Sequence, residues 1–114
     1  MDNSSRQYEL VVWGASGYTG RYVSEHVAEQ LPTDLKWALA GRSQQKLDSL
    51  VQDLKSLNAD RSAPAVEIAQ LEKDSLHALA KKTKVLISTV GPYFKYGQAV
   101  VEACAANGTH YVDW

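Results

Sequence analysis

The fold of this chain is decided by Val11-Val12-Trp13-Gly14-Ala15-Ser16-Gly17-Tyr18-Thr19-Gly20. A short apolar run ends here in three glycines spaced G-x-x-G-x-x-G, and apolar residues at helical spacing follow. This order predicts a strand, a tight turn and a helix start, where unpaired N–H groups and the helix dipole favour an anion. Glycines let the turn approach a phosphate without Cβ atoms in the way. We therefore expect residues 14–20 to hold the pyrophosphate of a dinucleotide; the open alternative is a turn used only for close packing.

The rest of the chain alternates between strand-like and helical patterns. We expect strands at 8–13, 35–40, 65–69, 85–90 and 109–113, and helices at 18–31, 75–82 and 97–107, the last closed by Gly108. A further helix starts after Ser43, a good N-cap residue, and its apolar face comprises Leu47, Leu50, Val51, Leu54 and Leu57. The pattern predicts an α/β fold: a doubly wound parallel sheet of the Rossmann type, with helices on both faces and strand order 3-2-1-4-5.

Length and charge limit what the chain can do. Its 114 residues suit one domain, which we place at residues 8–114 after a flexible tail of residues 1–7. The net charge of −1 gives no reason to expect a nucleic acid partner. No apolar run approaches the roughly 20 residues that span a bilayer, and the polar N-terminus does not resemble a signal peptide. We expect an intracellular, cytoplasmic protein, with peripheral membrane or lipid-droplet association as the open alternative.

The chain stops at Trp114, at the end of an expected buried strand. Doubly wound oxidoreductases usually continue into a substrate domain, so we expect a fragment whose small-molecule substrate is held by a missing C-terminal domain. The surface left by truncation, Trp114 included, predicts self-association at high concentration.

Ligands of such sheets bind where the loops after the first and fourth strands face each other. The second of these loops contains Gly91, Pro92 and Tyr93. Tyr93 either lines a nicotinamide site or belongs to a plain strand-to-helix turn. Asp113 ends the last strand at the same edge, where it either faces substrate or caps the next turn.

The second strand ends in Arg42 and Ser43, without the Asp or Glu that an NAD site uses to bind the ribose hydroxyls. The guanidinium of Arg42 suits a 2′-phosphate, Ser43 adds a hydroxyl, and Lys46 adds charge one helical turn later. We therefore expect NADP(H) in preference to NAD(H). The alternative for Arg42 is a solvated surface arginine.

Other reactive residue types carry no site. Cys104, the single cysteine, lies on an apolar helical face and is expected to be a core thiol. His26 and His77 fall on helices and are interpreted as structural or surface residues. Their spacing supports no metal site.

Four motifs occur together in this order: Gly14-Ala15-Ser16-Gly17-Tyr18-Thr19-Gly20, Ala40-Gly41-Arg42-Ser43, Thr89-Val90-Gly91-Pro92-Tyr93 with Tyr96-Gly97, and Thr109-His110-Tyr111-Val112-Asp113. The series resembles the N-terminal domain of the saccharopine dehydrogenase-like oxidoreductases, closest to the branch of trans-acting enoyl reductases, over nearly the whole chain. The resemblance implies a Rossmann domain for NAD(P)H, followed by a larger substrate and dimerisation domain.

The resemblance also assigns residues. It implies that Gly14, Gly17 and Gly20 bind the pyrophosphate, that Arg42 and Ser43 bind the ribose phosphate, and that Gly91, Pro92 and Tyr93 lie along the nicotinamide half. Family members continue from the Tyr-Val-Asp motif into a Thr-Gly-Glu-like turn, where this chain has Trp114 and ends. The catalytic residues are therefore unknown, with Tyr93 and Asp113 as candidates.

Two classes of function fit these observations. The first is the cofactor domain of an oxidoreductase; the second is a dinucleotide-binding sensor or scaffold that reduces nothing. A flavodoxin-like or response-regulator domain is disfavoured, because Trp13 and Gly14 stand where an acidic phosphoacceptor site is needed.

Overall fold

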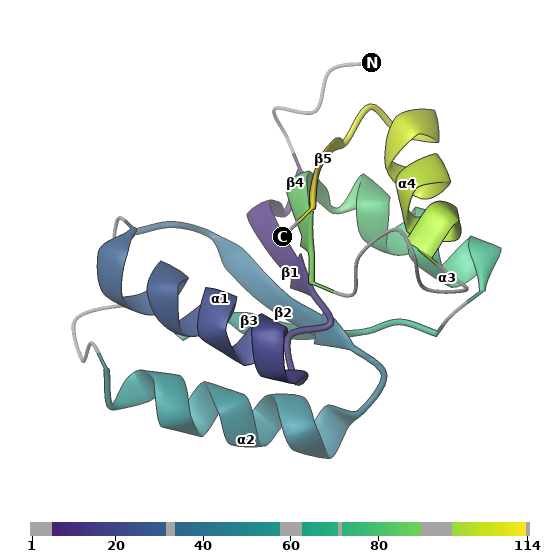
Figure 1. Cartoon of the computed structure of the whole chain (residues 1–114). Helices are drawn as coiled ribbons and strands as arrows, with labels where there is room; N and C mark the ends of the chain where they lie inside the picture. The colour runs from purple at the N-terminus through teal and green to yellow at the C-terminus, as the bar shows by residue number, and fades with distance from the viewer. Residues whose placement is uncertain (1–5, 32–33, 58–62, 71, 90–96, 114) are drawn as a thin grey trace.

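The computed structural model describes residues 6–31, 34–57, 63–70, 72–89 and 97–113 (Figure 1). Within these ranges strands and helices alternate strictly along the chain. The elements are β1 (Tyr8–Trp13), α1 (Tyr18–Gln30), β2 (Trp37–Gly41), α2 (Gln44–Lys55), β3 (Ala65–Ile68), α3 (Lys73–Lys81), β4 (Thr83–Ser88), α4 (Gly97–Ala106) and β5 (His110–Asp113).

The strands form one parallel sheet in the order β3-β2-β1-β4-β5, which confirms the predicted Rossmann topology. At the carboxyl end of β1, Trp13 lies in register with Ala40 on β2 and with Ser88 on β4. Ser88 in turn lies in register with Asp113 on β5. The strand order reverses between β1 and β4, so the turn after β1 lies at the switch point of the sheet.

Helices cover both faces of the sheet, with α1 and α2 on one side and α3 and α4 on the other (Figure 1). The core is accordingly divided in two. One cluster joins Leu10 and Val12 of β1 to α1 and α2, and the other joins Val11 and Trp13 to α3 and α4. Because both faces are covered, the successive residues of β1 from Leu10 to Trp13 are all apolar and buried, and only Glu9, near the start of the strand, is polar and exposed.

Helix ends follow the expected signals. Ser43 is the N-cap of α2, and its Oγ accepts a hydrogen bond from the Lys46 N–H at 3.3 Å. Gly108 follows α4 with φ of +67°, a left-handed conformation that favours glycine. Several boundaries differ from the expected ones. β2 begins two residues later than predicted, α3 begins two residues earlier, and β4 begins and ends two residues earlier. Leu57 lies beyond α2 with 40% of its surface exposed.

We expected residues 1–7 to form a flexible tail, but Arg6 is bonded to the folded chain. Its half-buried guanidinium donates hydrogen bonds to Ala80 O at 3.0 Å and Thr83 O at 2.7 Å. It also donates to Asn107 O and Thr109 Oγ1. The charge therefore lies against the carboxyl ends of α3 and α4, where the helix dipoles are negative. No local pattern in the sequence indicates these long-range contacts.

Candidate dinucleotide site

The turn after β1 is held by backbone hydrogen bonds. The N–H groups of Gly14 and Ala15 both donate to Ala40 O on β2, at 2.9 and 3.2 Å. The Gly17 N–H then donates to Gly14 O at 3.0 Å, which closes the turn. Gly14 has φ of +78°, so this position favours glycine.

The first N–H groups of α1 have no hydrogen-bond partner within the helix. The helix begins at Tyr18, and the first N–H that bonds back along it belongs to Arg21, which donates to Gly17 O at 2.8 Å. The N–H groups of Tyr18, Thr19 and Gly20 therefore have no partner within the helix. Gly17 at the N-cap supplies no side-chain cap, and the first turn has no acidic residue. By contrast, α2 is capped by Ser43. The start of α1 is thus suited to an anionic group.

The three glycines of the turn have different physical causes. A Cβ on Gly20 would lie 2.1 Å from Gly14 O and 2.7 Å from Ala15 Cα, so close packing of α1 on the turn requires glycine there. A Cβ on Gly17 would meet only Gly14 O, at an ordinary 3.4 Å. The positive φ explains Gly14 and close packing explains Gly20, but neither explains Gly17 when only the described residues are considered. A ligand that approaches the backbone at Gly17 would explain it.

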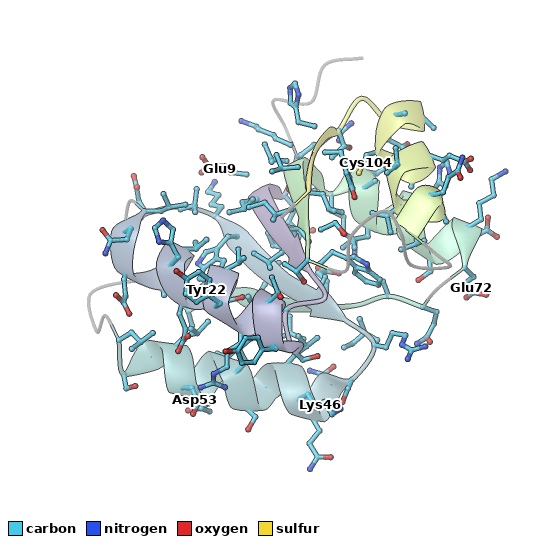
Figure 2. The ribbon with its side chains drawn as sticks, in the orientation of Figure 1. Glu9, Tyr22, Lys46, Asp53, Glu72 and Cys104 are labelled. Carbon is cyan, nitrogen blue, oxygen red and sulfur yellow. The ribbon has the colours of Figure 1, made fainter. Side chains whose placement is uncertain are left out.

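Two residues of the turn and the helix start, Ser16 and Tyr18, have side chains that face solvent, whereas Ala15 is buried in the core. Ser16 is exposed, and the Tyr18 ring is 96% exposed, so these residues offer their backbone rather than buried side chains. Tyr22 follows one helical turn later and also lies on the outer side of α1 (Figure 2).

Positive charge gathers where β2 leads into α2. Arg42 and Lys46 are exposed, and neither forms an ion pair with the part of the chain that the structure describes. Figure 2 shows Lys46 near the start of α2. The starts of α1 and α2 lie at the same end of their layer (Figure 1). The Ser43 hydroxyl accepts the capping hydrogen bond from Lys46 N–H, and its own hydrogen remains available to donate.

Three predicted residues, Gly91, Pro92 and Tyr93, lie outside the described residues. Asp113 closes β5 in register with Ser88, and only its backbone is described. The nicotinamide half of the predicted site and both catalytic candidates therefore stay predictions.

Thr89, which follows β4, begins the third of the four motifs, but the sequence predicted no role for it. Its N–H donates to Trp13 O at 3.1 Å, and its Oγ1 lies 2.8 Å from Trp13 O and 3.1 Å from Gly14 O. The glycine turn is therefore bonded to β4 as well as to β2. The sequence gives no local signal for this contact, because Thr89 lies 76 residues after Trp13 and 75 residues after Gly14.

Two buried polar atoms lie at the same edge of the sheet. Trp13 Nε1 and Ser88 Oγ belong to residues in register on β1 and β4, and neither has a hydrogen-bond partner among the described residues. Trp37 Nε1, at the start of β2, is in the same condition. Such atoms are uncommon in folded proteins, because an unpaired buried donor is costly.

A second polar cluster joins β1, β3 and the segment after α3. Tyr8 Oη donates to Glu67 Oε2 at 2.5 Å, and Lys82 Nζ donates to Glu67 Oε1 at 2.7 Å. Burial, with a contribution from Glu67, raises the pKa of Tyr8. Burial also acts to raise the pKa of Glu67, but hydrogen bonds from Lys82 and Tyr8 outweigh it and lower the pKa overall. The cluster links elements that are distant from one another in the sequence, and no residue of the glycine turn takes part in these hydrogen bonds.

Cys104 is confirmed as a core thiol at 1% exposure, and Figure 2 shows it by α4. Burial raises the pKa of its thiol to about 11, with the Arg6 charge opposing the rise. His77 Nδ1 lies 3.1 Å from Asn107 Nδ2, so His77 has a structural partner, while His26 is exposed.

Across the described ranges, no three His, Cys, Asp or Glu residues are grouped as a metal would need. None of the described helices is both long and apolar enough to cross a membrane.

A five-stranded parallel sheet with an open helix N-terminus at its switch point defines a Rossmann-type dinucleotide-binding domain. Residues 10–114 match the family described as the saccharopine dehydrogenase NADP binding domain. The chain belongs to this family, as the motifs predicted, and its cofactor is NADP(H).

Known proteins agree with the assignment. The chain is 39% identical to a saccharopine dehydrogenase-like oxidoreductase of Rattus norvegicus, over 99% of this chain and 28% of that protein. It is 37% identical to a trans-acting enoyl reductase of Mycobacterium ulcerans, over 99% of this chain and 26% of the relative. It is 40% identical to a lipid droplet localized protein of Caenorhabditis elegans, over 94% of this chain and 26% of the relative. The chain thus spans about a quarter of the length of these relatives.

Among solved structures, the apo form of AtPrR2 superposes with a TM-score of 0.67 at 18% identity. The match covers 93% of this chain and 37% of that one, and it shows a shared fold.

Proposed function

We propose that this domain holds NADP(H) across the carboxyl edge of its sheet and presents the nicotinamide to a substrate bound by another part of a longer oxidoreductase. The observation that carries the proposal is the N-terminus of α1, which has neither a side-chain cap nor an acidic residue in its first turn. The pyrophosphate would accept hydrogen bonds from the N–H groups of Tyr18, Thr19 and Gly20. When bound, the nicotinamide supplies or accepts a hydride at its C4 atom.

Arg42 would discriminate NADP from NAD. It is exposed beside the start of α2, it has no ion-pair partner in the described residues, and Ser43 and Lys46 lie next to it. A guanidinium binds a 2′-phosphate through charge-assisted hydrogen bonds worth about 1.5–3 kcal/mol each. At about 1.4 kcal/mol per tenfold, one such bond corresponds to a change in Kd of roughly 10- to 100-fold.

Calorimetric titration with NADPH and with NADH tests both statements. The Arg42→Glu variant should weaken NADPH binding by at least about tenfold and NADH binding much less. Lys36→Glu is the matched control, because it makes the same charge change at an exposed residue just before β2, at the opposite end of that strand. Equal weakening of both cofactors by Arg42→Glu would exclude the 2′-phosphate role. If the unaltered domain bound neither cofactor, the whole proposal would fail.

A non-catalytic sensor or scaffold is the second candidate. One observation favours it: the Caenorhabditis elegans relative is named for its location on lipid droplets rather than for a reaction. The two candidates differ in whether the full-length protein oxidises NADPH when it is given a reducible substrate. We place the protein in the cytoplasm, with lipid-droplet association as the alternative; imaging of the tagged full-length protein decides between them.

A further inference from the structure

We propose that Thr89 is a positioning residue for the pyrophosphate: its hydroxyl keeps the first carbonyl of the glycine turn directed away from the bound ligand. The inference rests on the proposed function, because it concerns the same site at the start of α1. We call this site, made of the N–H groups of Tyr18, Thr19 and Gly20, the pyrophosphate seat. The inference adds Thr89, the residue directly after β4, which belongs to the third sequence motif but has been given no role at that site.

The geometry around Thr89 is specific. The residue is half-buried directly after β4, and it contacts the end of β1 through two groups. Its backbone N–H donates to Trp13 O at 3.1 Å. Its hydroxyl lies 2.8 Å from Trp13 O and 3.1 Å from Gly14 O, so one hydrogen is shared between consecutive carbonyls. The backbone bond continues the β1–β4 pairing by itself. The hydroxyl therefore adds something that the pairing does not need.

What the hydroxyl adds is a second donor for Gly14 O. This carbonyl also accepts the Gly17 N–H at 3.0 Å. It packs so closely against α1 that a Cβ on Gly20 would lie 2.1 Å from it. Gly14 O thus lies on the protein side of the turn, while the N–H groups at the start of α1 are left for a ligand. If the peptide between Gly14 and Ala15 rotated, Gly14 O would leave these donors and the Ala15 N–H would leave Ala40 O.

That rotation would harm an anion site in particular. A carbonyl oxygen carries partial negative charge and repels a phosphate in the weakly screened environment of a turn. Gly14 is the residue at which such a rotation is easiest, because a glycine with φ of +78° has no Cβ to restrict it. The Thr89 hydroxyl opposes the rotation from the side of β4. Its loss should therefore reduce affinity for pyrophosphate-containing ligands more than it reduces stability.

The experiment compares Thr89→Val, which removes the hydroxyl at nearly constant shape, with Thr89→Ser, which keeps it. Thr83→Val is the matched control: Thr83 lies at the opposite end of β4, and its hydroxyl donates to Val85 O at 2.9 Å. Each variant is titrated with NADPH, with ADP and with adenosine 2′-monophosphate, which has no pyrophosphate. We expect Thr89→Val to weaken NADPH and ADP binding by about tenfold, equivalent to about 1.4 kcal/mol. Binding of adenosine 2′-monophosphate should stay within about twofold, as should NADPH binding by Thr89→Ser and Thr83→Val.

A second measurement needs no ligand. The Gly17 N–H donates to Gly14 O, so its hydrogen exchange reports how firmly that carbonyl is held. Exchange at Gly17 should be faster in Thr89→Val than in the unaltered protein and in Thr89→Ser. If Thr89→Val does not fold, Thr89→Ala serves for both measurements.

Several results would overturn the inference. They are unchanged NADPH affinity in Thr89→Val, equal weakening of NADPH and adenosine 2′-monophosphate, and a Thr89→Ser variant as weak as Thr89→Val. Any of these, with NADPH still bound by the unaltered protein, refutes the role of Thr89 alone. Absence of NADPH binding by the unaltered protein refutes the proposed function and this inference together.

Discussion

Substitution by alanine at Gly17 and at Gly20 should have opposite consequences, although the two residues lie three positions apart in one motif. In Gly17→Ala the new methyl group finds only Gly14 O, at 3.4 Å, and the backbone at φ −77° and ψ 173° suits alanine. In Gly20→Ala the methyl group would lie 2.1 Å from Gly14 O and 2.7 Å from Ala15 Cα. Both of these atoms are backbone, so neither can move aside by changing rotamer.

The expected free energies of unfolding follow from these distances. At the N-cap, alanine is less favourable than glycine by a few tenths to about 1 kcal/mol. A less flexible unfolded chain returns about 0.4–1 kcal/mol, so Gly17→Ala should be near neutral. In Gly20→Ala, alanine's helix propensity contributes about 1 kcal/mol. The contact would force α1 about 1 Å away from the turn, and such overpacking costs typically 1–3 kcal/mol, occasionally more. Because both contacted atoms are backbone, we take the upper part of this range, about 2–3 kcal/mol, which leaves a net loss of about 1–2 kcal/mol, or roughly 4–16 °C in Tm for a domain of this size.

Gly17→Ala, which should leave stability nearly unchanged, should nevertheless weaken cofactor binding. The Gly17 methyl group would occupy the space through which a pyrophosphate approaches the first N–H groups of α1, so we expect at least a tenfold rise in the Kd for NADPH, or about 1.4 kcal/mol. Thermal unfolding without ligand and calorimetric titration with NADPH measure the two effects separately. The reasoning is refuted if Gly17→Ala unfolds as easily as Gly20→Ala, or if it binds NADPH like the unaltered protein.

Three further outcomes concern the core and its cross-links. Glu67→Gln should cost about 1 kcal/mol at neutral pH after allowance for screening of the 43%-exposed Lys82. Because folding lowers the pKa of Glu67, this contribution is present above its ordinary value of 4.5 and is lost as the pH falls through the folded-state pKa, so urea unfolding curves of the two proteins should converge in acid. Cys104, with its pKa raised to about 11, should react with a thiol reagent at pH 8 roughly a thousandfold more slowly than a fully ionised thiolate, and rapid labelling of the folded protein would contradict its burial. Arg6→Ala should lower stability by about 1–3 kcal/mol, because it removes hydrogen bonds to Ala80 O and Asn107 O; an unchanged Tm would show that the N-terminal segment contributes nothing.

The strand order was predictable because it depends on features that repeat along the chain. Apolar runs and helical stripes alternate, and right-handed crossovers then leave few topologies. Boundaries were less predictable where a polar residue is buried. Thr83 is fully buried at the start of β4, with its hydroxyl satisfied by Val85 O, so the strand begins before the apolar run suggests. The contacts of Arg6 were unpredictable for a similar reason. A charged residue near the N-terminus is typical of a flexible tail, and only folding brings the ends of α3 and α4 close to it.

The candidate site also has a part that the sequence predicts and a part that it does not. The glycine spacing predicts the backbone part of the site, because a left-handed turn and the close approach of a helix each require a residue without a Cβ at a fixed position. The motif therefore predicted a seat made of N–H groups, and the structure shows those of Tyr18, Thr19 and Gly20 without partners within α1. The Thr89 contact has no such signature, since any residue after β4 has a backbone N–H to continue the pairing with Trp13, and only the folded geometry shows a hydroxyl that also reaches Gly14 O. The glycine spacing consequently predicts the N–H groups proposed to bind the ligand, whereas the proposed positioning contact of Thr89 is found only in the folded structure. For this domain that difference is measurable: Gly17→Ala should change whether the cofactor fits, and variants of Thr89 should change how firmly the glycine turn is held in position.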